Sequence, residues 1–148
     1  MESFAAQPGQ ILARGVCRHL TRAGHACLME FVPARGLRVD VLALCASGEI
    51  WVVECKSSRA DFMSDQKWQG YLDWCDRFFW AVDADFPLEL LPEETGVIRA
   101  DGYDGEVIRD APLDKLAAPR RKAITLKVGR VAAQRLTRVL DPEMAEWE

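Results

Sequence analysis

The spacing of hydrophobic residues changes several times along the chain, and each change predicts a separate element. Over residues 10–23 the apolar side chains recur every three or four positions, which is typical of an amphipathic helix, and Gly24 follows as a stop signal. Residues 25–32 indicate a strand. Residues 37–45 and 49–55 alternate and are rich in β-branched side chains, so they predict the two arms of a β-hairpin.

Helical spacing returns over residues 62–75 and is followed by a short strand, residues 77–82, that is apolar on both faces. Such a strand usually lies in the centre of a sheet, and a helix before it supplies the crossover that parallel pairing needs. Weak strands at 97–100 and 106–109 and a last helix at 119–140, opened by a proline, complete the pattern. We therefore predict one α/β domain, with a mixed central sheet flanked by helices.

The length of the hairpin connection decides which face of the sheet Asp40 occupies. Glu54 and Lys56 lie two residues apart along an alternating strand, so they share a face. A three-residue loop that ends with Gly48 in the left-handed conformation pairs Asp40 with Glu54, with β-carbons about 5 Å apart. A two-residue turn would place Asp40 on the opposite face. A site that uses both carboxylates therefore requires the three-residue loop.

Two carboxylates that face each other repel, so stability does not explain Asp40 and Glu54. A hard cation such as Mg²⁺ relieves the repulsion and keeps waters for a substrate phosphate. Lys56 could then orient or activate a metal-bound water and stabilise charge on the phosphate. The alternative is a solvated face with ordinary cross-strand ion pairs. The apolar residues around both acids favour the catalytic interpretation.

Val39-Asp40, thirteen further residues, Glu54-Cys55-Lys56 and a following helix resemble the PD-(D/E)xK nuclease superfamily. The segment ECKSSRADFMSDQKWQGYLDWCDRFFWAV more closely resembles the MmcB family of bacterial DNA-repair proteins, and this similarity extends over most of the chain. Val39 replaces the proline of the superfamily motif. The resemblance implies a restriction-endonuclease-like core, a role in DNA repair, and a site that uses Mg²⁺ or Mn²⁺. It also implies Asp40, Glu54 and the Cys55 carbonyl as metal ligands and Lys56 as the catalytic lysine.

Three further residues are expected to support this site. Lys67 and Tyr71 are four residues apart and share a face of the predicted helix. They resemble a Gln-x-x-x-Tyr pair that some members of the superfamily place beside the active site, although a solvated Lys67 and a core Tyr71 are equally compatible with the sequence. Glu30, on the strand before Asp40, resembles an auxiliary acidic ligand of related nucleases. The turn after Glu30 leaves its face undecided.

Charge is distributed unevenly along the chain. Residues 1–114 carry 11 Lys and Arg against 19 Asp and Glu, whereas residues 115–140 carry eight basic residues and no acid. A basic block on an acidic chain favours an anionic partner. The last helix is amphipathic, with Leu126, Leu136 and Leu140 on the side away from its basic residues. We expect a DNA phosphate track, rather than a merely solvated face, formed by Arg120, Arg121, Lys122, Lys127, Arg130 and Arg138.

The remaining composition limits the possible classes of protein. Five cysteines without a CxxC pair lie mostly in apolar runs, which predicts reduced core thiols in a cytoplasmic protein, and their spacing from the histidines fits no zinc template. No stretch is apolar enough to span a membrane, and the N-terminus lacks the features of a secretory signal.

Three interpretations remain after these exclusions. The predicted function is metal-dependent hydrolysis of DNA phosphodiester bonds in repair, and the rival is a non-catalytic DNA-binding or adaptor module that retains the same fold. The third is a purely structural α/β protein, which would show no salt-dependent affinity for DNA. Many enzymes of the superfamily dimerise to cut two strands, which leaves a homodimer open for this chain.

Overall fold

The computed structural model describes residues 6–147, and the chain divides into two compact units between Leu116 and Ala117. The first unit carries the sheet. The second consists of α3 (Ala118–Leu140) and a short 3₁₀ helix, η3 (Pro142–Trp147). Within residues 6–147, no helix is long and apolar enough to cross a membrane.

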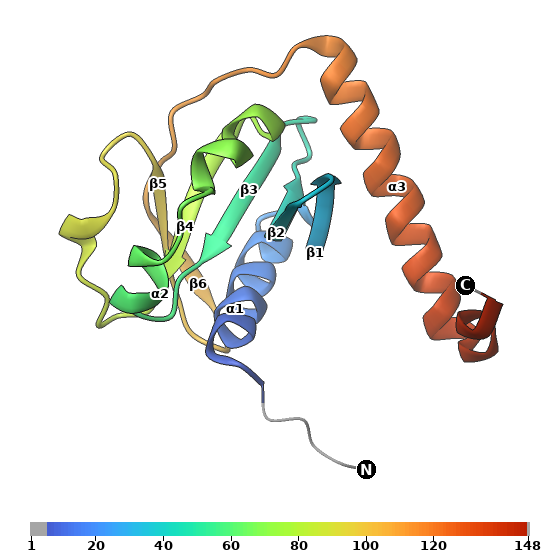
Figure 1. Cartoon of the computed structure of the whole chain (residues 1–148), viewed down its shortest axis with the longest axis horizontal. Coiled ribbons are helices and arrows are strands. Elements are labelled where there is room, and N and C mark those ends of the chain that lie inside the picture. Colours follow the sequence, from blue (N-terminus) through green and yellow to red (C-terminus); the bar gives the residue numbers. More distant parts are fainter. Residues whose placement is uncertain (1–5, 148) are drawn as a thin grey trace. The chain divides into compact units, whose positions relative to one another are not determined.

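The first unit is built on a six-stranded mixed sheet whose strands lie side by side in chain order (Figure 1). The strands are β1 (Ala26–Ala34), β2 (Leu37–Leu44), β3 (Ile50–Cys55), β4 (Arg77–Val82), β5 (Gly96–Ala100) and β6 (Gly105–Arg109). β3, β4 and β5 run parallel to one another, and the other neighbouring pairs are antiparallel. The predicted mixed sheet and the central position of the strand at 77–82 are both confirmed.

The two faces of the sheet are covered by different elements. One face packs against α1 (Pro8–Arg22), whose buried apolar stripe comprises Leu12, Ala13, Val16 and Leu20. The opposite face packs against the 3₁₀ helix η1 (Trp68–Trp74), in which Trp68 contacts the rings of Phe78 and Trp80. Since side chains alternate along a strand and the neighbours of Glu54 face α1, the Glu54 side chain lies on the η1 face.

The connection between β2 and β3 is the three-residue loop that the site hypothesis requires. Gly48 has φ 91°, and the Cys45 N–H donates to the Glu49 carbonyl at 2.9 Å. Val41 is paired with Val53, so that one residue further Asp40 lies opposite Glu54. The predicted register is confirmed, and glycine supplies the positive φ at little steric cost.

The single helix predicted over residues 62–75 is wrong. This segment contains the end of a short helix, α2 (Arg59–Met63), then a loop, and then η1. The break occurs at Asp65, whose Oδ1 accepts the Lys67 N–H at 2.9 Å. An aspartate that bonds its own backbone two residues on offers the chain an alternative to the helical ladder, and the pattern of apolar residues does not register this competition.

Gly15 allows α1 to approach the turn between β5 and β6 closely. A β-carbon at this position would lie 2.7 Å from the Asp104 carbonyl oxygen and still closer to that of Asp101. Both obstacles are backbone atoms, which cannot rotate away. The absence of a side chain at Gly15 therefore sets the distance between α1 and the far edge of the sheet.

Gly15→Ala should destabilise the protein by about 1–3 kcal/mol, because the added methyl group overpacks a backbone contact. Gly9→Ala in the same helix is the control, since nothing lies within 4 Å of a β-carbon at Gly9. Chemical denaturation of both variants measures the difference. Equal stabilities of the two variants would contradict the close packing at Gly15.

Candidate functional site

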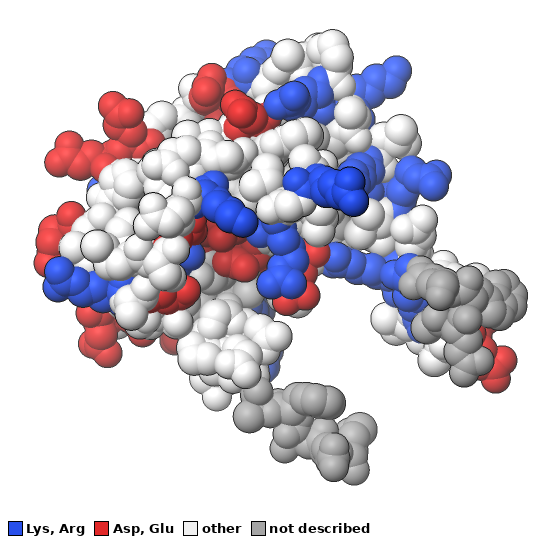
Figure 2. Space-filling model, in the orientation of Figure 1, with Lys and Arg blue, Asp and Glu red and all other residues white. Residues whose placement is uncertain are grey.

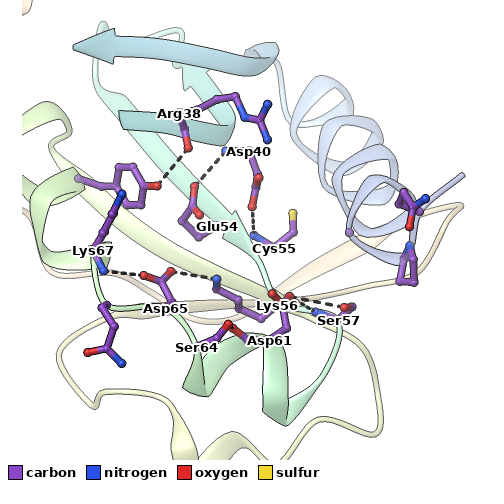
Figure 3. A pocket seen from close by; sticks show the side chains of 15 residues that line it. Arg38, Asp40, Glu54, Cys55, Lys56, Ser57, Asp61, Ser64, Asp65 and Lys67 are labelled. Atoms are coloured by element: carbon purple, nitrogen blue, oxygen red, sulfur yellow. Dashed lines mark hydrogen bonds and ion pairs between the residues drawn. The ribbon is translucent and has the colours of Figure 1, made fainter. Parts of the chain in front are cut away.

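A cleft of about 670 Å³ opens where β3 ends, and all of its walls belong to the first unit (Figure 3). Its walls come from β2, the end of β3, the loop between α2 and η1, and the start of α1. The lining residues are Gln7, Pro8, Gly9, Arg38, Asp40, Glu54, Cys55, Lys56, Ser57, Asp61, Ser64, Asp65, Gln66, Lys67 and Tyr71. On the face drawn in Figure 2, acidic side chains gather in a hollow beside basic ones.

Asp40 and Glu54 are held by each other's strands. The Asp40 N–H donates to Glu54 Oε1 at 3.0 Å, and the Cys55 N–H donates to Asp40 Oδ2 at 2.8 Å. Within the described chain, the second oxygen of each carboxylate accepts no hydrogen bond. The hairpin thus fixes both carboxylates and leaves one oxygen of each for a ligand in the cleft.

The carboxylates are placed where their negative charge is unfavourable. Burial and the charge of Asp40 raise the pKa of Glu54 to about 8. Burial also raises the pKa of Asp40, although the Cys55 N–H and the charge of Lys56 oppose this. A cation bound between the two acids would oppose both shifts, because it stabilises the ionised carboxylates.

Lys56 lies in the cleft as predicted, but its ammonium group is paired with an acid that the sequence did not single out. Lys56 Nζ is 2.9 Å from Asp65 Oδ2, and the two side chains are only 10% and 9% exposed. Burial lowers the pKa of Lys56, but the hydrogen bond to Asp65 and the charges of Asp65, Asp61 and Glu54 together raise it overall. Lys56 is therefore a fixed, charged group beside Glu54.

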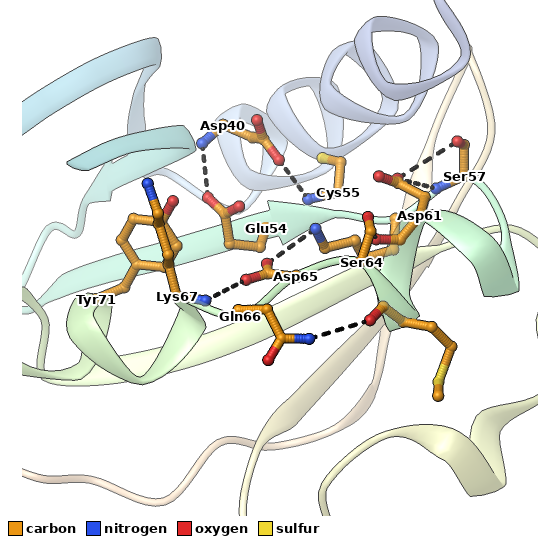
Figure 4. A network of polar contacts seen from close by, with 12 residues as sticks. Asp40, Glu54, Cys55, Ser57, Asp61, Ser64, Asp65, Gln66, Lys67 and Tyr71 are labelled. Atoms are coloured by element: carbon orange, nitrogen blue, oxygen red, sulfur yellow. Dashed lines mark hydrogen bonds and ion pairs between the residues drawn. The ribbon is translucent and has the colours of Figure 1, made fainter. Parts of the chain in front are cut away.

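Asp65 belongs to a network that shapes the loop between α2 and η1 (Figure 4). It accepts the Lys67 N–H with one oxygen and binds Lys56 with the other. Nearby, Asp61 accepts the Ser57 N–H at 3.1 Å, and the Ser58 hydroxyl accepts the Asp61 N–H at 3.1 Å and caps α2. No strand alternation or helical period connects Asp65 to Lys56, so a sequence pattern could not have found this pair.

Lys67 and Tyr71 both line the cleft, although the predicted reason is wrong. Lys67 precedes a 3₁₀ helix rather than lying within an α-helix, so four-residue spacing does not give the two residues a common face. The Tyr71 hydroxyl donates to the Arg38 carbonyl at 3.1 Å, and burial raises the pKa of Tyr71 to about 12. Tyr71 thus braces β2 as a neutral phenol, while Lys67 and Arg38 contribute positive charge to the cleft.

Two predicted residues remain, of which Cys55 borders the cleft and Glu30 does not. The Cys55 side chain belongs to the core on the α1 face, so only the backbone of this residue borders the site, and burial raises the pKa of its thiol well above the usual value. Glu30 does not line the cleft. It lies exposed on β1 with φ 51°, a left-handed backbone conformation that interrupts the alternation of strand β1.

No group of three or more His, Cys, Asp and Glu side chains in residues 6–147 forms a metal site. The donors at hand are the carboxylates of Asp40 and Glu54. This set is too small for zinc or a tightly caged Ca²⁺, but it suits Mg²⁺ or Mn²⁺, which bind through one or two carboxylates and retain several waters. The free carboxylate oxygens and the raised pKa of Glu54 are compatible with such an ion.

The second unit carries the residues predicted to bind DNA. Arg120, Lys122, Lys127 and Arg130 are exposed on α3, and Arg121 and Arg138 are partly buried. The apolar side of the helix is not covered as amphipathicity suggested, because Leu126, Leu136 and Leu140 are 64%, 58% and 75% exposed while Ile124 and Val128 are buried. The exposed basic side chains thus share this helix with exposed leucines, and their role in DNA binding stays a prediction.

Comparison with known proteins agrees with this architecture. The model of a family described as "DNA repair protein MmcB-like" matches residues 4–143. A solved structure of a protein of unknown function from Silicibacter pomeroyi is 61% identical in sequence, with a TM-score of 0.92, and the match covers 95% of this chain and 96% of that one. None of the curated proteins matches the sequence.

Lys56 and Asp65 should stabilise each other in a double-mutant cycle of Lys56→Ala and Asp65→Ala, with a coupling energy of about 2 kcal/mol. The cycle isolates the Lys56–Asp65 interaction, because it subtracts what Asp65 contributes to the stability of its own loop. The control pair is Arg22 and Asp104, which are 2.7 Å apart but 59% and 53% exposed. Solvent screens that pair, so its coupling should lie near experimental error. Equal couplings in the two cycles would mean that burial adds nothing to the Lys56–Asp65 pair.

Glu54→Gln should flatten the pH dependence of stability when divalent ions are chelated. The pKa of Glu54 is about 8 in the folded protein and near its ordinary value of 4.5 in the unfolded chain, so the folded protein binds more protons between these values. The free energy of unfolding of the wild type therefore falls as pH rises from about 5 to 8, and the variant should be the more stable protein at pH 8.

Thermal denaturation across this pH range in chelator measures the effect. Glu49→Gln is the control, because a hydrogen bond from Arg77 lowers the pKa of Glu49 and places its contribution at acid pH. If the stability of Glu54→Gln fell with pH as steeply as that of the wild type, an unfavourable charge at Glu54 would be ruled out.

Proposed function

The chain belongs to the MmcB-like family of DNA repair proteins, and on this premise we propose that it is a divalent-metal-dependent DNA nuclease. The observation that carries the proposal is the opposition of Asp40 and Glu54 across the hairpin, with Lys56 two residues beyond Glu54. Two acids and one amine from adjacent strands form the donor set that metal-assisted phosphodiester hydrolysis needs.

In this proposal Asp40 and Glu54, with the Cys55 carbonyl, would hold Mg²⁺ or Mn²⁺. The ion would supply Lewis acidity and lower the pKa of a water in the site. The chain's own contribution is rigidity. Because each carboxylate already accepts a backbone N–H from the neighbouring strand, its free oxygen is directed into the cleft before any ligand arrives.

Lys56 is proposed to act on the reacting phosphate and on the attacking water. Its ammonium group is held by Asp65 at 2.9 Å and is sheltered from solvent, which strengthens its electrostatic effect. Arg38 and Lys67 in the cleft wall would contact the phosphates on either side of the scissile bond. The exposed basic residues of α3 would add sequence-independent affinity that falls with salt.

The second candidate function is a DNA-binding or adaptor module without turnover. The pairing of Lys56 with Asp65 favours it, because an ammonium group occupied by a carboxylate has fewer donors left for a substrate. Both candidates predict DNA binding, so affinity alone does not separate them.

Lys56→Ala should lower the rate of DNA cleavage about 10²–10³-fold in Mg²⁺ or Mn²⁺, because it removes a preorganised positive charge from the site. Single-stranded, nicked and branched DNA should be tested with purified wild type and variant, together with equilibrium binding of each DNA. Unchanged cleavage by Lys56→Ala would assign the activity to a contaminant or to another site. Binding without cleavage by both proteins, in both metals, would establish the adaptor.

Arg130→Ala is the matched control on α3, since it removes an exposed cation outside the cleft. It should reduce the slope of log affinity against log salt by about 0.9 for duplex DNA while leaving the rate at saturating DNA unchanged. An unchanged salt slope would exclude this residue from the DNA track.

A further inference from the structure

A second cavity lies beside the cleft, and its walls also belong to the first unit alone. This cavity, called here the β4–β5 pocket, measures about 580 Å³ and opens where strands β4 and β5 end. Pro8 and Ser57 line both the cleft and the β4–β5 pocket. A ligand held in the cleft can therefore extend into the second cavity.

One part of the β4–β5 pocket is apolar. α1 contributes Pro8, Ile11 and Leu12, and the segment after β4 contributes Ala84. Ile11 is 41% exposed, although it lies on the helix that packs against the sheet. Apolar side chains that remain open to solvent in a cavity of this size suit a small ring system better than a chain of charged groups.

The polar part of the pocket offers acceptors and a donor together. Asp83 Oδ1 accepts the Asp85 N–H at 3.0 Å, while Asp83 Oδ2 accepts no hydrogen bond from residues 6–147. On β5, the exposed Arg99 guanidinium forms no ion pair or hydrogen bond within the same residues. Carboxylate oxygens and a guanidinium group are thus both available to a ligand in the pocket.

Two further carboxylates at the pocket serve the turn between β5 and β6. Asp101 Oδ1 accepts the N–H groups of Tyr103 and Asp104 at 2.8 and 2.9 Å. Asp104 accepts the Gly105 N–H at 2.8 Å and lies 2.7 Å from Arg22. These two acids are occupied by the fold, which leaves recognition to the groups after β4 and on β5.

A nucleobase matches this combination of surfaces. Its ring faces pack on apolar side chains, and its edge carries amino donors beside carbonyl or ring-nitrogen acceptors. Asp83 and Asp85 would accept from the amino groups, and Arg99 would donate to the acceptors. A bare phosphate would instead meet two carboxylates, and a purely apolar ligand would bury charged groups without partners.

We propose that the β4–β5 pocket binds an unpaired base of the DNA strand whose phosphate occupies the cleft. This inference rests on the proposed function and narrows its substrate class to single-stranded or locally unpaired DNA. β3, β4 and β5 are parallel neighbours about 5 Å apart, so a base close to the phosphate can reach the pocket. A base inside an intact duplex is stacked and paired, and it cannot enter without being extruded.

Ala84→Trp should fill the pocket without altering the cleft, because Ala84 is exposed and lines only the β4–β5 pocket. Its affinity for a short single-stranded oligonucleotide should fall about tenfold, while its affinity for a blunt duplex of the same sequence stays unchanged. Equilibrium binding in Mg²⁺ measures both, with phosphorothioate linkages to slow hydrolysis. Ala46→Trp, at an exposed alanine outside both cavities, is the control.

Asp83→Asn tests the recognition of the base edge and decides the proposal if Ala84→Trp does not fold. The amide oxygen of the variant can still accept the Asp85 N–H, but an amino group replaces the free acceptor. The wild type should bind oligo-dC about tenfold more tightly than oligo-dT, because cytosine has an amino group that thymine lacks. The variant should lose most of this preference.

Cleavage of the same sequences with ordinary phosphodiester linkages, measured in parallel, separates the two proposals. An unchanged ratio of single-stranded to duplex affinity in Ala84→Trp, or an unchanged preference for oligo-dC in Asp83→Asn, would overturn the base site even if the DNA is cut. If the variants lose their selectivity but the wild type cuts none of the DNAs, the base site stands and the nuclease proposal fails.

Discussion

The structure of the candidate site depends on two carboxyl groups that the hairpin holds opposite each other. Asp40 and Glu54 cannot separate, because the β2–β3 register fixes their positions and each accepts a hydrogen bond from the strand of the other. Apolar side chains at these two buried positions would give a more stable fold than two carboxyl groups do. A proton or a cation between the acids would relieve their repulsion, and this is what the proposed function assigns to the hairpin.

The cations already present in the cleft do not meet that need. Lys56 keeps its charge but is paired with Asp65, so the buried pair as a whole adds no net positive charge to the cleft. Arg38 and Lys67 belong to the cleft wall, but no ion pair joins either of them to Asp40 or Glu54 in the described chain. Divalent metal and phosphate together would balance the charges of the cleft, because the metal meets the carboxylates and the basic residues meet the phosphate.

The sequence predicted the parts of the site that follow from strand geometry. Alternation placed Glu54 and Lys56 on one face, and the three-residue loop, one of two alternatives that the sequence left open, added Asp40 to them. They could not predict Asp65 or the break in the helix at 62–75, because that break results from a side chain competing locally for backbone N–H groups. The amphipathic spacing also could not predict that Leu126, Leu136 and Leu140 are exposed, because it does not specify what covers the apolar face of a helix.

The position of Asp65 nevertheless has a topological cause. β3 and β4 are parallel neighbours, so the chain must cross one face of the sheet between Cys55 and Arg77. α1 occupies the other face, which leaves the face that carries Glu54 for the crossover. Trp68 then anchors the crossover on Phe78 and Trp80. The loop before Trp68 is thereby held over the end of β3, next to Lys56. An acid in that loop can therefore pair with the lysine, although no hydrophobic or polar pattern in the sequence indicates the pair.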